Sequence, residues 1–247
     1  MFQTGTRVSA SHSTLSTQRI GLLGGTFNPI HRCHLTLAHE VRHRLNLDLV
    51  LFIPTGDPPH KLTAGLAPAQ DRLAMVTLAL EGEPSFAVSD IEVRRPGISY
   101  SIDTVTLLQQ EWGTTAKVYF LIGLDAFLDL ATWRRAGDLL TSCHFVVVSR
   151  PGASFTDLSR MELLPRLDEA ALHNLDVGRT DSLVFELPGA HRLFLLAIPP
   201  CVVSATLIRE RLRRQSSLDG LLPAQVESYI LRKGLYRENH HLAGFKS

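Results

Sequence analysis

Two hydrophobic patterns alternate along the chain. Short continuous apolar runs are typical of strands that are buried on both faces of a parallel sheet. Such runs, together with a mixed strand-like segment at 86–93, predict strands over 20–23, 49–53, 86–93, 117–122, 145–148 and 193–198. Segments with apolar residues three and four positions apart separate these runs, as at Leu35, Ala38, Val41 and Leu45. This spacing predicts helices between the strands.

Helical spacing continues to the C-terminal part of the chain. It predicts helices over 70–81, 102–112, 205–215 and 223–233, with Gly234 as the C-cap of the last one. Strands that alternate with helices indicate βαβ units and a parallel sheet. We therefore predict an α/β fold, namely a Rossmann-like doubly wound parallel sheet with C-terminal helices in a single domain.

The ends and one internal region lack this alternation. Residues 1–18 are rich in Ser and Thr and have no apolar centre, so we predict a disordered extension rather than a secretory signal. The domain is predicted over 19–237, with a flexible tail over 238–247. The region 152–191 is interrupted by Pro165, Gly178 and Pro188, and we expect a helix near 158–172 and loops around it.

Composition limits the function classes. The net charge is +1 with 20% charged residues, so no overall field attracts nucleic acid or a membrane, and any anion site must be local. No run has the length needed to span a bilayer. The three cysteines, Cys33, Cys143 and Cys201, are odd in number and widely spaced, which favours free thiols in a reducing cytoplasm over a disulfide framework.

The segment from Gly24 to His34 follows the first predicted strand and precedes the first helix. Such a turn brings backbone N–H groups and a helix N-terminus to one point, which favours anion binding. It matches neither the P-loop nor the dinucleotide fingerprint. Two histidines, His31 and His34, lie there, and imidazolium groups stabilise charge on a leaving pyrophosphate. The alternative is that His34 only caps or packs the helix.

Other candidates follow later strands, because ligands of such sheets bind at the carboxyl ends of the strands. Lys61 lies in a proline-rich loop and is either a mobile cation for the ligand or a solvated lysine. Gly123 leaves room for a nucleoside, and Asp125 accepts from ribose hydroxyls or caps a helix. Trp133 either stacks on a flat ring or belongs to the core.

A second anion site is predicted after the last strand. Ser204 is expected to cap the helix at 205–215, and Thr206 and Arg209 lie in its first turns. One glycine turn, two histidines, a lysine, an arginine, two hydroxyls and an acid suit a nucleoside triphosphate with an anionic acceptor. Positioning and electrostatics suffice for that transfer.

Several motifs together resemble the bacterial nicotinate-nucleotide adenylyltransferases, within the nucleotidyltransferases that carry an (H/T)-x-G-H motif. The resemblance runs from about Ile20 to Tyr236. The matching segments are 24–34, 58–61, 99–104, 122–125 followed by Trp133, 150–152, 204–211, 222–230 and 234–236.

The resemblance implies transfer of the adenylyl group of ATP, with Mg²⁺, to nicotinate mononucleotide in NAD biosynthesis. It implies catalysis by His31 and His34, and a substrate site that includes Lys61. The ATP-binding residues it implies are Gly24, Gly25, Thr26, Phe27, Gly123, Asp125, Ser204, Thr206 and Arg209. Trp133 would stack on the nicotinate ring, and the backbone near Ser101 and Arg134 would meet its carboxylate.

Three positions depart from the family pattern. Asn28 stands where Asp is commoner, Ser101 where Thr is commoner, and Cys33 where the motif has Gly, so a Cβ is expected to crowd the phosphates. Two alternatives stay open: a related transferase with another acceptor such as phosphopantetheine, and a non-catalytic nucleotide-binding module. The sequence also leaves a homo-oligomer possible.

Overall fold

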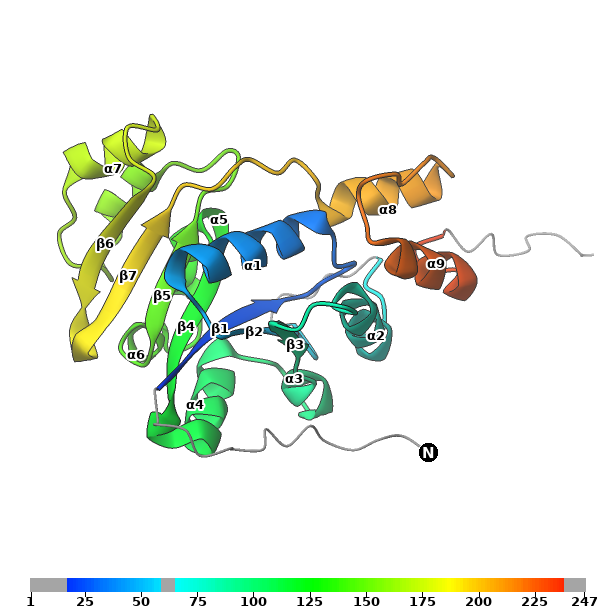
Figure 1. Ribbon diagram of the computed structural model, residues 1–247, viewed down its shortest axis with the longest axis horizontal. Coiled ribbons are helices and arrows are strands. Elements are labelled where there is room, and N and C mark those ends of the chain that lie inside the picture. Colours follow the sequence, from blue (N-terminus) through cyan, green and yellow to red (C-terminus); the bar gives the residue numbers. More distant parts are fainter. Residues whose placement is uncertain (1–16, 59–64, 238–247) are drawn as a thin grey trace, which may run out of the picture.

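A computed structural model describes residues 17–58 and 65–237 and contains a seven-stranded sheet in the order β3-β2-β1-β4-β5-β7-β6 (Figure 1). The six pairings are parallel except for β6 with β7. The strands are β1 (Gln18–Gly25), β2 (Leu49–Pro54), β3 (Phe86–Val88), β4 (Ala116–Gly123), β5 (His144–Val148), β6 (Ser182–Leu187) and β7 (His191–Leu196).

Helices connect the strands and close the chain. The α-helices are α1 (Arg32–Leu45), α2 (Ala69–Ala79), α3 (Ile91–Arg94), α4 (Ser101–Trp112), α5 (Leu124–Leu128), α6 (Ala136–Leu140), α7 (Glu169–Asp176), α8 (Ala205–Arg213) and α9 (Ala224–Lys233). Short 3₁₀ turns are η1 (Gly113–Thr115), η2 (Leu130–Thr132), η3 (Phe155–Arg160) and η4 (Pro188–Ala190). Gly234 is the C-cap of α9 with φ 65°, as predicted.

The sheet separates two hydrophobic cores, which is why its central strands are apolar on both faces. One core packs Leu22 and Phe120 against α4, α5 and α6. The other packs Leu23 and Leu121 against α1, α2, α8 and α9. The predicted α/β fold is therefore confirmed, and α1 crosses one face of the sheet in Figure 1.

The order of the strands reverses between β1 and β4. From β1 the chain builds outward to β2 and β3, and it then returns to add β4 on the other side of β1. Ligands of doubly wound sheets bind at the carboxyl ends of strands at this switch point. Gly25 ends β1 and Gly123 ends β4, so the fold brings these two glycine ends together.

Two predicted elements are wrong. The strand expected over 86–93 stops at Val88, and the chain turns into α3, where Glu92 is buried and accepts from the Thr104 hydroxyl at 2.7 Å. The helix expected near 158–172 is instead η3 and α7, separated by a turn that contains Pro165. The antiparallel edge strand β6 was not predicted, because its alternating pattern is short and partly exposed.

The expectation of free cysteines is also wrong. Cys33 and Cys201 form a disulfide with Cα atoms 5.6 Å apart, and Cys143 is free and buried. The sequence hides this pairing because 168 residues separate the two cysteines, and only the fold brings α1 beside the loop before α8.

The boundaries of the domain stay a prediction, since residues 1–16 and 238–247 lie outside the described part. Within the described residues, no helix combines the length and the apolar character needed to cross a membrane.

Candidate active site

A pocket of about 520 Å³ lies at the switch point of the sheet. Its wall combines the ends of β1 and β4, the start of α4 and the segment after α5. Among the predicted residues, it is lined by Gly24, Gly25, Thr26, His34, Ser101, Gly123, Asp125, Trp133 and Arg134.

The turn after β1 forms one end of the pocket. A Cβ placed on Gly24 would have no atom within 4 Å, so open space lies beside this backbone. Phe27 follows with φ 47°, an uncommon backbone conformation for a residue with a side chain. Its ring is buried and meets the His34 ring edge-on at a centroid distance of 5.0 Å. Phe27 therefore supports His34 from behind rather than lining the pocket.

The two predicted histidines form a stacked pair with ring centroids 3.8 Å apart. The backbone N–H of His31 donates to Nδ1 of His34 at 3.2 Å, which also caps the start of α1. When His34 is neutral, this bond places its proton on Nε2, so that nitrogen is a donor. His34 lines the pocket, whereas His31 is buried behind it. The His34 side chain thus both caps α1 and lines the pocket.

Burial keeps both imidazoles neutral at pH 7. Burial, together with the positive charge of Arg150, lowers the pKa of His31 to about 4. Burial also lowers the pKa of His34 well below its ordinary value, with added contributions from His31 and Arg150. A bound polyphosphate would oppose these effects, because a nearby anion favours the charged imidazolium.

The end of β4 forms the opposite wall. A Cβ on Gly123 would lie 2.5 Å from Oδ1 of Asp125 and 2.7 Å from Nε of Arg150, so a larger residue would displace the ends of both side chains. The Asp125 carboxylate is exposed and its Oδ1 lies 3.9 Å from Nε of Arg150. Gly123, rather than Asp125, is the N-cap of α5, so the capping alternative for Asp125 does not apply.

Aromatic and cationic side chains gather at the far end of the pocket. Trp133 packs against the core, with its ring edge-on to Phe120 at 6.3 Å, and also lines the pocket. The Arg134 guanidinium lies 4.6 Å above the Tyr100 ring. Ser101 begins α4, whose first backbone N–H groups have no partner within the helix. A flat ring that carries an anionic group fits this end of the pocket, because the aromatic surface suits the ring and the N–H donors suit the anion.

The comparisons with known proteins decide the family. A Pelobacter propionicus protein named "Probable nicotinate-nucleotide adenylyltransferase" is 42% identical over 220 residues, covering 89% of this chain and 99% of that protein. A Moorella thermoacetica protein with the same name is 37% identical over 219 residues, covering 89% and 92%. The chain belongs to the nicotinate-nucleotide adenylyltransferase family. A wider family model, described as Cytidylyltransferase-like, matches residues 22–211.

Solved structures agree at the level of the fold. The nicotinic acid mononucleotide adenylyltransferase of Plasmodium falciparum, complexed with NaAD, has a TM-score of 0.65 at 16% identity. The match covers 89% of this chain and 97% of that one. The same protein complexed with APC gives a TM-score of 0.64. The fold is therefore that of a nucleotidyltransferase.

The second predicted ATP segment of this chain lies beside the pocket rather than in its wall. Ser204 caps α8 as predicted, because its Oγ accepts from Leu207 N at 3.2 Å. Arg209 turns toward the β1–α1 turn, and its Nη1 donates to the Asn28 carbonyl at 2.7 Å. Its Nη2 donates to the Thr206 hydroxyl at 3.2 Å. Lys61 lies outside the described residues.

Asn28 explains one departure from the family pattern. Its Nδ2 donates to the Gly65 carbonyl at 2.8 Å, and its Oδ1 accepts from Ala67 N at 3.0 Å and from the Tyr236 hydroxyl at 2.9 Å. An ionised aspartate has no donor for Gly65. The side-chain amide of Asn28 therefore connects the β1–α1 turn to residues 65–67, before α2, and to Tyr236, after α9.

Sequence reasoning missed Arg72, which is 1% exposed and lies on the buried face of α2. Its guanidinium donates to the carbonyls of Thr26 at 2.7 Å, Gly56 at 2.9 Å and Ala67 at 3.1 Å. It thereby holds the loops that follow β1 and β2. An arginine at the helical spacing of Met75 and Val76 was the pattern that could have indicated this role.

Arg150 lies in the segment 150–152 that resembles the family, and the sequence predicts no role for it. It lines the pocket, and its Nε is buried without a hydrogen-bond partner among the described residues. The Asp125 carboxylate at 3.9 Å is too far to accept a hydrogen bond, so this guanidinium nitrogen is a candidate donor for an anion in the pocket.

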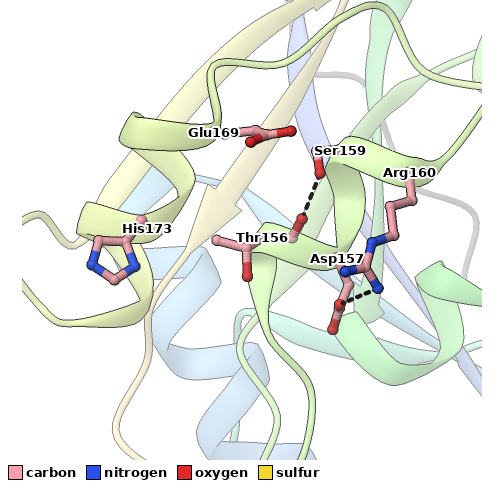
Figure 2. A pocket seen from close by; sticks show the side chains of 6 residues that line it. All are labelled: Thr156, Asp157, Ser159, Arg160, Glu169 and His173. Atoms are coloured by element: carbon pink, nitrogen blue, oxygen red, sulfur yellow. Dashed lines mark hydrogen bonds and ion pairs between the residues drawn. The ribbon is translucent and has the colours of Figure 1, made fainter.

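A second pocket of about 370 Å³ lies between η3 and α7, away from these residues (Figure 2). Its side chains include Glu169 and His173 and an Asp157–Arg160 ion pair of 3.7 Å. Across the described ranges 17–58 and 65–237, no cluster of three or more His, Cys, Asp or Glu residues could hold a metal ion.

Proposed function

We propose that this chain transfers the adenylyl group of ATP to nicotinate mononucleotide, giving deamido-NAD and pyrophosphate for NAD biosynthesis. The observation that carries the proposal is one pocket with a phosphate-binding turn at one end and an aromatic, cationic surface at the other. ATP, the donor, needs the phosphate-binding turn. Nicotinate mononucleotide, the acceptor, needs the aromatic, cationic surface for its ring and its carboxylate. The 42% identical relative, which covers 89% of this chain, carries the same activity in its name.

In this proposal the phosphate of nicotinate mononucleotide attacks the α-phosphorus of ATP. A P–O bond forms to the acceptor phosphate, and the bond to pyrophosphate breaks with its electrons on the leaving oxygen. Nε2–H of His34 donates to the phosphates, and Arg150 stabilises the negative charge that increases as pyrophosphate leaves. His31 positions His34 through their 3.8 Å stack.

Mg²⁺ enters this proposal as part of the ATP substrate. Phosphate oxygens and water are its preferred ligands in such reactions.

Selectivity for nicotinate rests on its carboxylate. The first N–H groups of α4, at Ser101 and Ile102, and the Arg134 guanidinium are donors. Donors favour an anionic carboxylate over the amide of nicotinamide, whose NH₂ group would face them without an acceptor. Trp133 supplies the surface on which the ring stacks.

The proposed partners are the two nucleotides, and the proposed location is the cytoplasm. Light scattering of the purified chain separates a monomer from a homo-oligomer.

One assay tests the function. The protein receives ATP and Mg²⁺ with nicotinate mononucleotide, nicotinamide mononucleotide or phosphopantetheine in turn, and pyrophosphate release is measured. Release that strongly prefers the nicotinate form is expected. Release only with another acceptor would replace the proposed substrate, and no release with any acceptor would favour a binding module.

A further inference from the structure

The disulfide joins the two segments that are assigned to the ATP phosphates. Cys33 lies in the first turn of α1, between His31 and His34. Cys201 lies in the loop after β7, three positions before the Ser204 cap of α8. A single covalent bond therefore sets the separation of the β1–α1 turn from the start of α8.

The disulfide leaves the pocket open. Cys33 is 2% exposed and is absent from the lining of the pocket, although the adjacent His34 belongs to it. The sulfur is directed to Cys201 instead. The Cβ at this glycine position of the motif thus does not fill the phosphate site, contrary to the crowding expected from the sequence.

We propose that Cys33 and Cys201 are a thiol–disulfide modification site that tunes the affinity of the enzyme for ATP. The proposal rests on the proposed function of the pocket. The oxidised form fixes both phosphate-binding segments in one arrangement, so it binds ATP more tightly than the reduced form, since less motion is lost on binding.

The exchange chemistry needs a disulfide as oxidant, and glutathione disulfide represents that class. The Cys201 thiolate attacks one sulfur of glutathione disulfide and releases one glutathione thiolate. The Cys33 thiolate then attacks the Cys201 sulfur of this mixed disulfide and releases the second glutathione. Two protein thiols are oxidised to one disulfide, and one glutathione disulfide is reduced to two thiols.

The surroundings assign different roles to the two sulfurs. Cys201 is half-buried next to Val202, which is 83% exposed, so external thiols reach the Cys201 side first. Cys33 is buried in the first turn of a 14-residue helix, where external thiols do not reach its sulfur. Cys33 is therefore the sulfur that leaves when an external thiol attacks Cys201. When a disulfide occurs in a cytosolic protein, it is usually transient and redox-sensing.

Noncovalent contacts limit the size of the effect. The Arg209–Asn28 hydrogen bond of 2.7 Å joins α8 to the β1–α1 turn, and the Arg32 N to Leu221 O bond of 3.1 Å joins the start of α1 to the segment before α9. These contacts survive reduction, so α8 stays beside the turn. We expect the dissociation constant for ATP to change by about fivefold rather than binding to be lost.

Cys143 provides an internal control. It is 1% exposed, and burial raises the pKa of its thiol to about 12, so it stays unreactive at neutral pH.

The test equilibrates the full-length protein with defined ratios of reduced to oxidised glutathione. Alkylation and peptide mass mapping count the free thiols, and calorimetry measures the dissociation constant of a non-hydrolysable ATP analogue. The oxidised protein should retain one free thiol, at Cys143, and bind the analogue about fivefold more tightly than the reduced protein. Cys201→Ala should bind like the reduced protein at every ratio, and Cys143→Ala should respond like the wild type.

Two results would overturn the proposal: no Cys33–Cys201 disulfide at any ratio, or equal analogue affinities, within twofold, in both forms. The readout does not require turnover. An affinity shift without pyrophosphate release would support the redox site and contradict the proposed reaction. Pyrophosphate release without an affinity shift would support the reaction and contradict the redox site.

Discussion

The two segments assigned to ATP phosphates differ in how firmly the fold holds them. The β1–α1 turn is buried: Phe27, Asn28 and His31 are at most 5% exposed. The start of α8 is exposed at Ser204 and Thr206, and it is tied to the turn mainly by Arg209 and the disulfide. The difference suggests that the preorganised turn performs the chemistry and that α8 contributes ATP affinity.

The largest expected effect is a loss of turnover when His34, in the first turn of α1, is replaced. Replacing His34 with Ala removes the donor that faces the pocket, and kcat should fall by about 10²–10³-fold, as for the loss of one transition-state donor. The His31 N–H also loses its acceptor at the start of α1, so the free energy of unfolding should fall by about 1 kcal/mol, too little to unfold the protein. His39→Ala, an exposed histidine on the same helix, is the matched control. Turnover near the wild-type value would remove His34 from the chemistry.

The next effect concerns the support of the turn. Arg72→Met leaves the carbonyls of Thr26, Gly56 and Ala67 without their donor. It also removes one of the two positive charges near Glu92, the other being Arg95. The free energy of unfolding should fall by about 3 kcal/mol, which is typical of breaking a buried polar network. Urea denaturation measures it, with exposed Arg94→Met as the control. A loss below about 1 kcal/mol would show that Arg72 does not hold the turn.

A smaller effect follows from pH. The pKa of His31 is about 4 in the folded protein and near 6.5 when unfolded, so the unfolded chain binds more protons between these values. Stability from His31 is complete above pH 6.5 and is lost as the pH falls toward 4. From pH 7 to pH 5 the wild type should lose about 2 kcal/mol more than His31→Gln. Parallel losses in the two proteins would contradict the buried neutral imidazole.

The sequence predicted the fold, and it also predicted many of the residues that the structure brings to one pocket, because both depend on local patterns. Apolar runs followed by Gly25 and Gly123 are visible without a structure, and the topology then brings these strand ends together. The disulfide, the Arg72 network and the antiparallel β6 depend on contacts between distant segments. Asn28 illustrates the limit, since its partners Gly65, Ala67 and Tyr236 are 37 to 208 residues away.

The division between chemistry and affinity is tested most directly by binding without turnover. Calorimetry with a non-hydrolysable ATP analogue should give His34→Ala a dissociation constant within about threefold of the wild type, because most of its effect lies in the transition state. Arg209→Ala should bind about tenfold more weakly while retaining most of its kcat, since a charged phosphate contact and the link to Asn28 are lost. Arg213→Ala, on the same helix, should match the wild type. The reverse pattern, with weak binding in His34→Ala and normal binding in Arg209→Ala, would contradict the account.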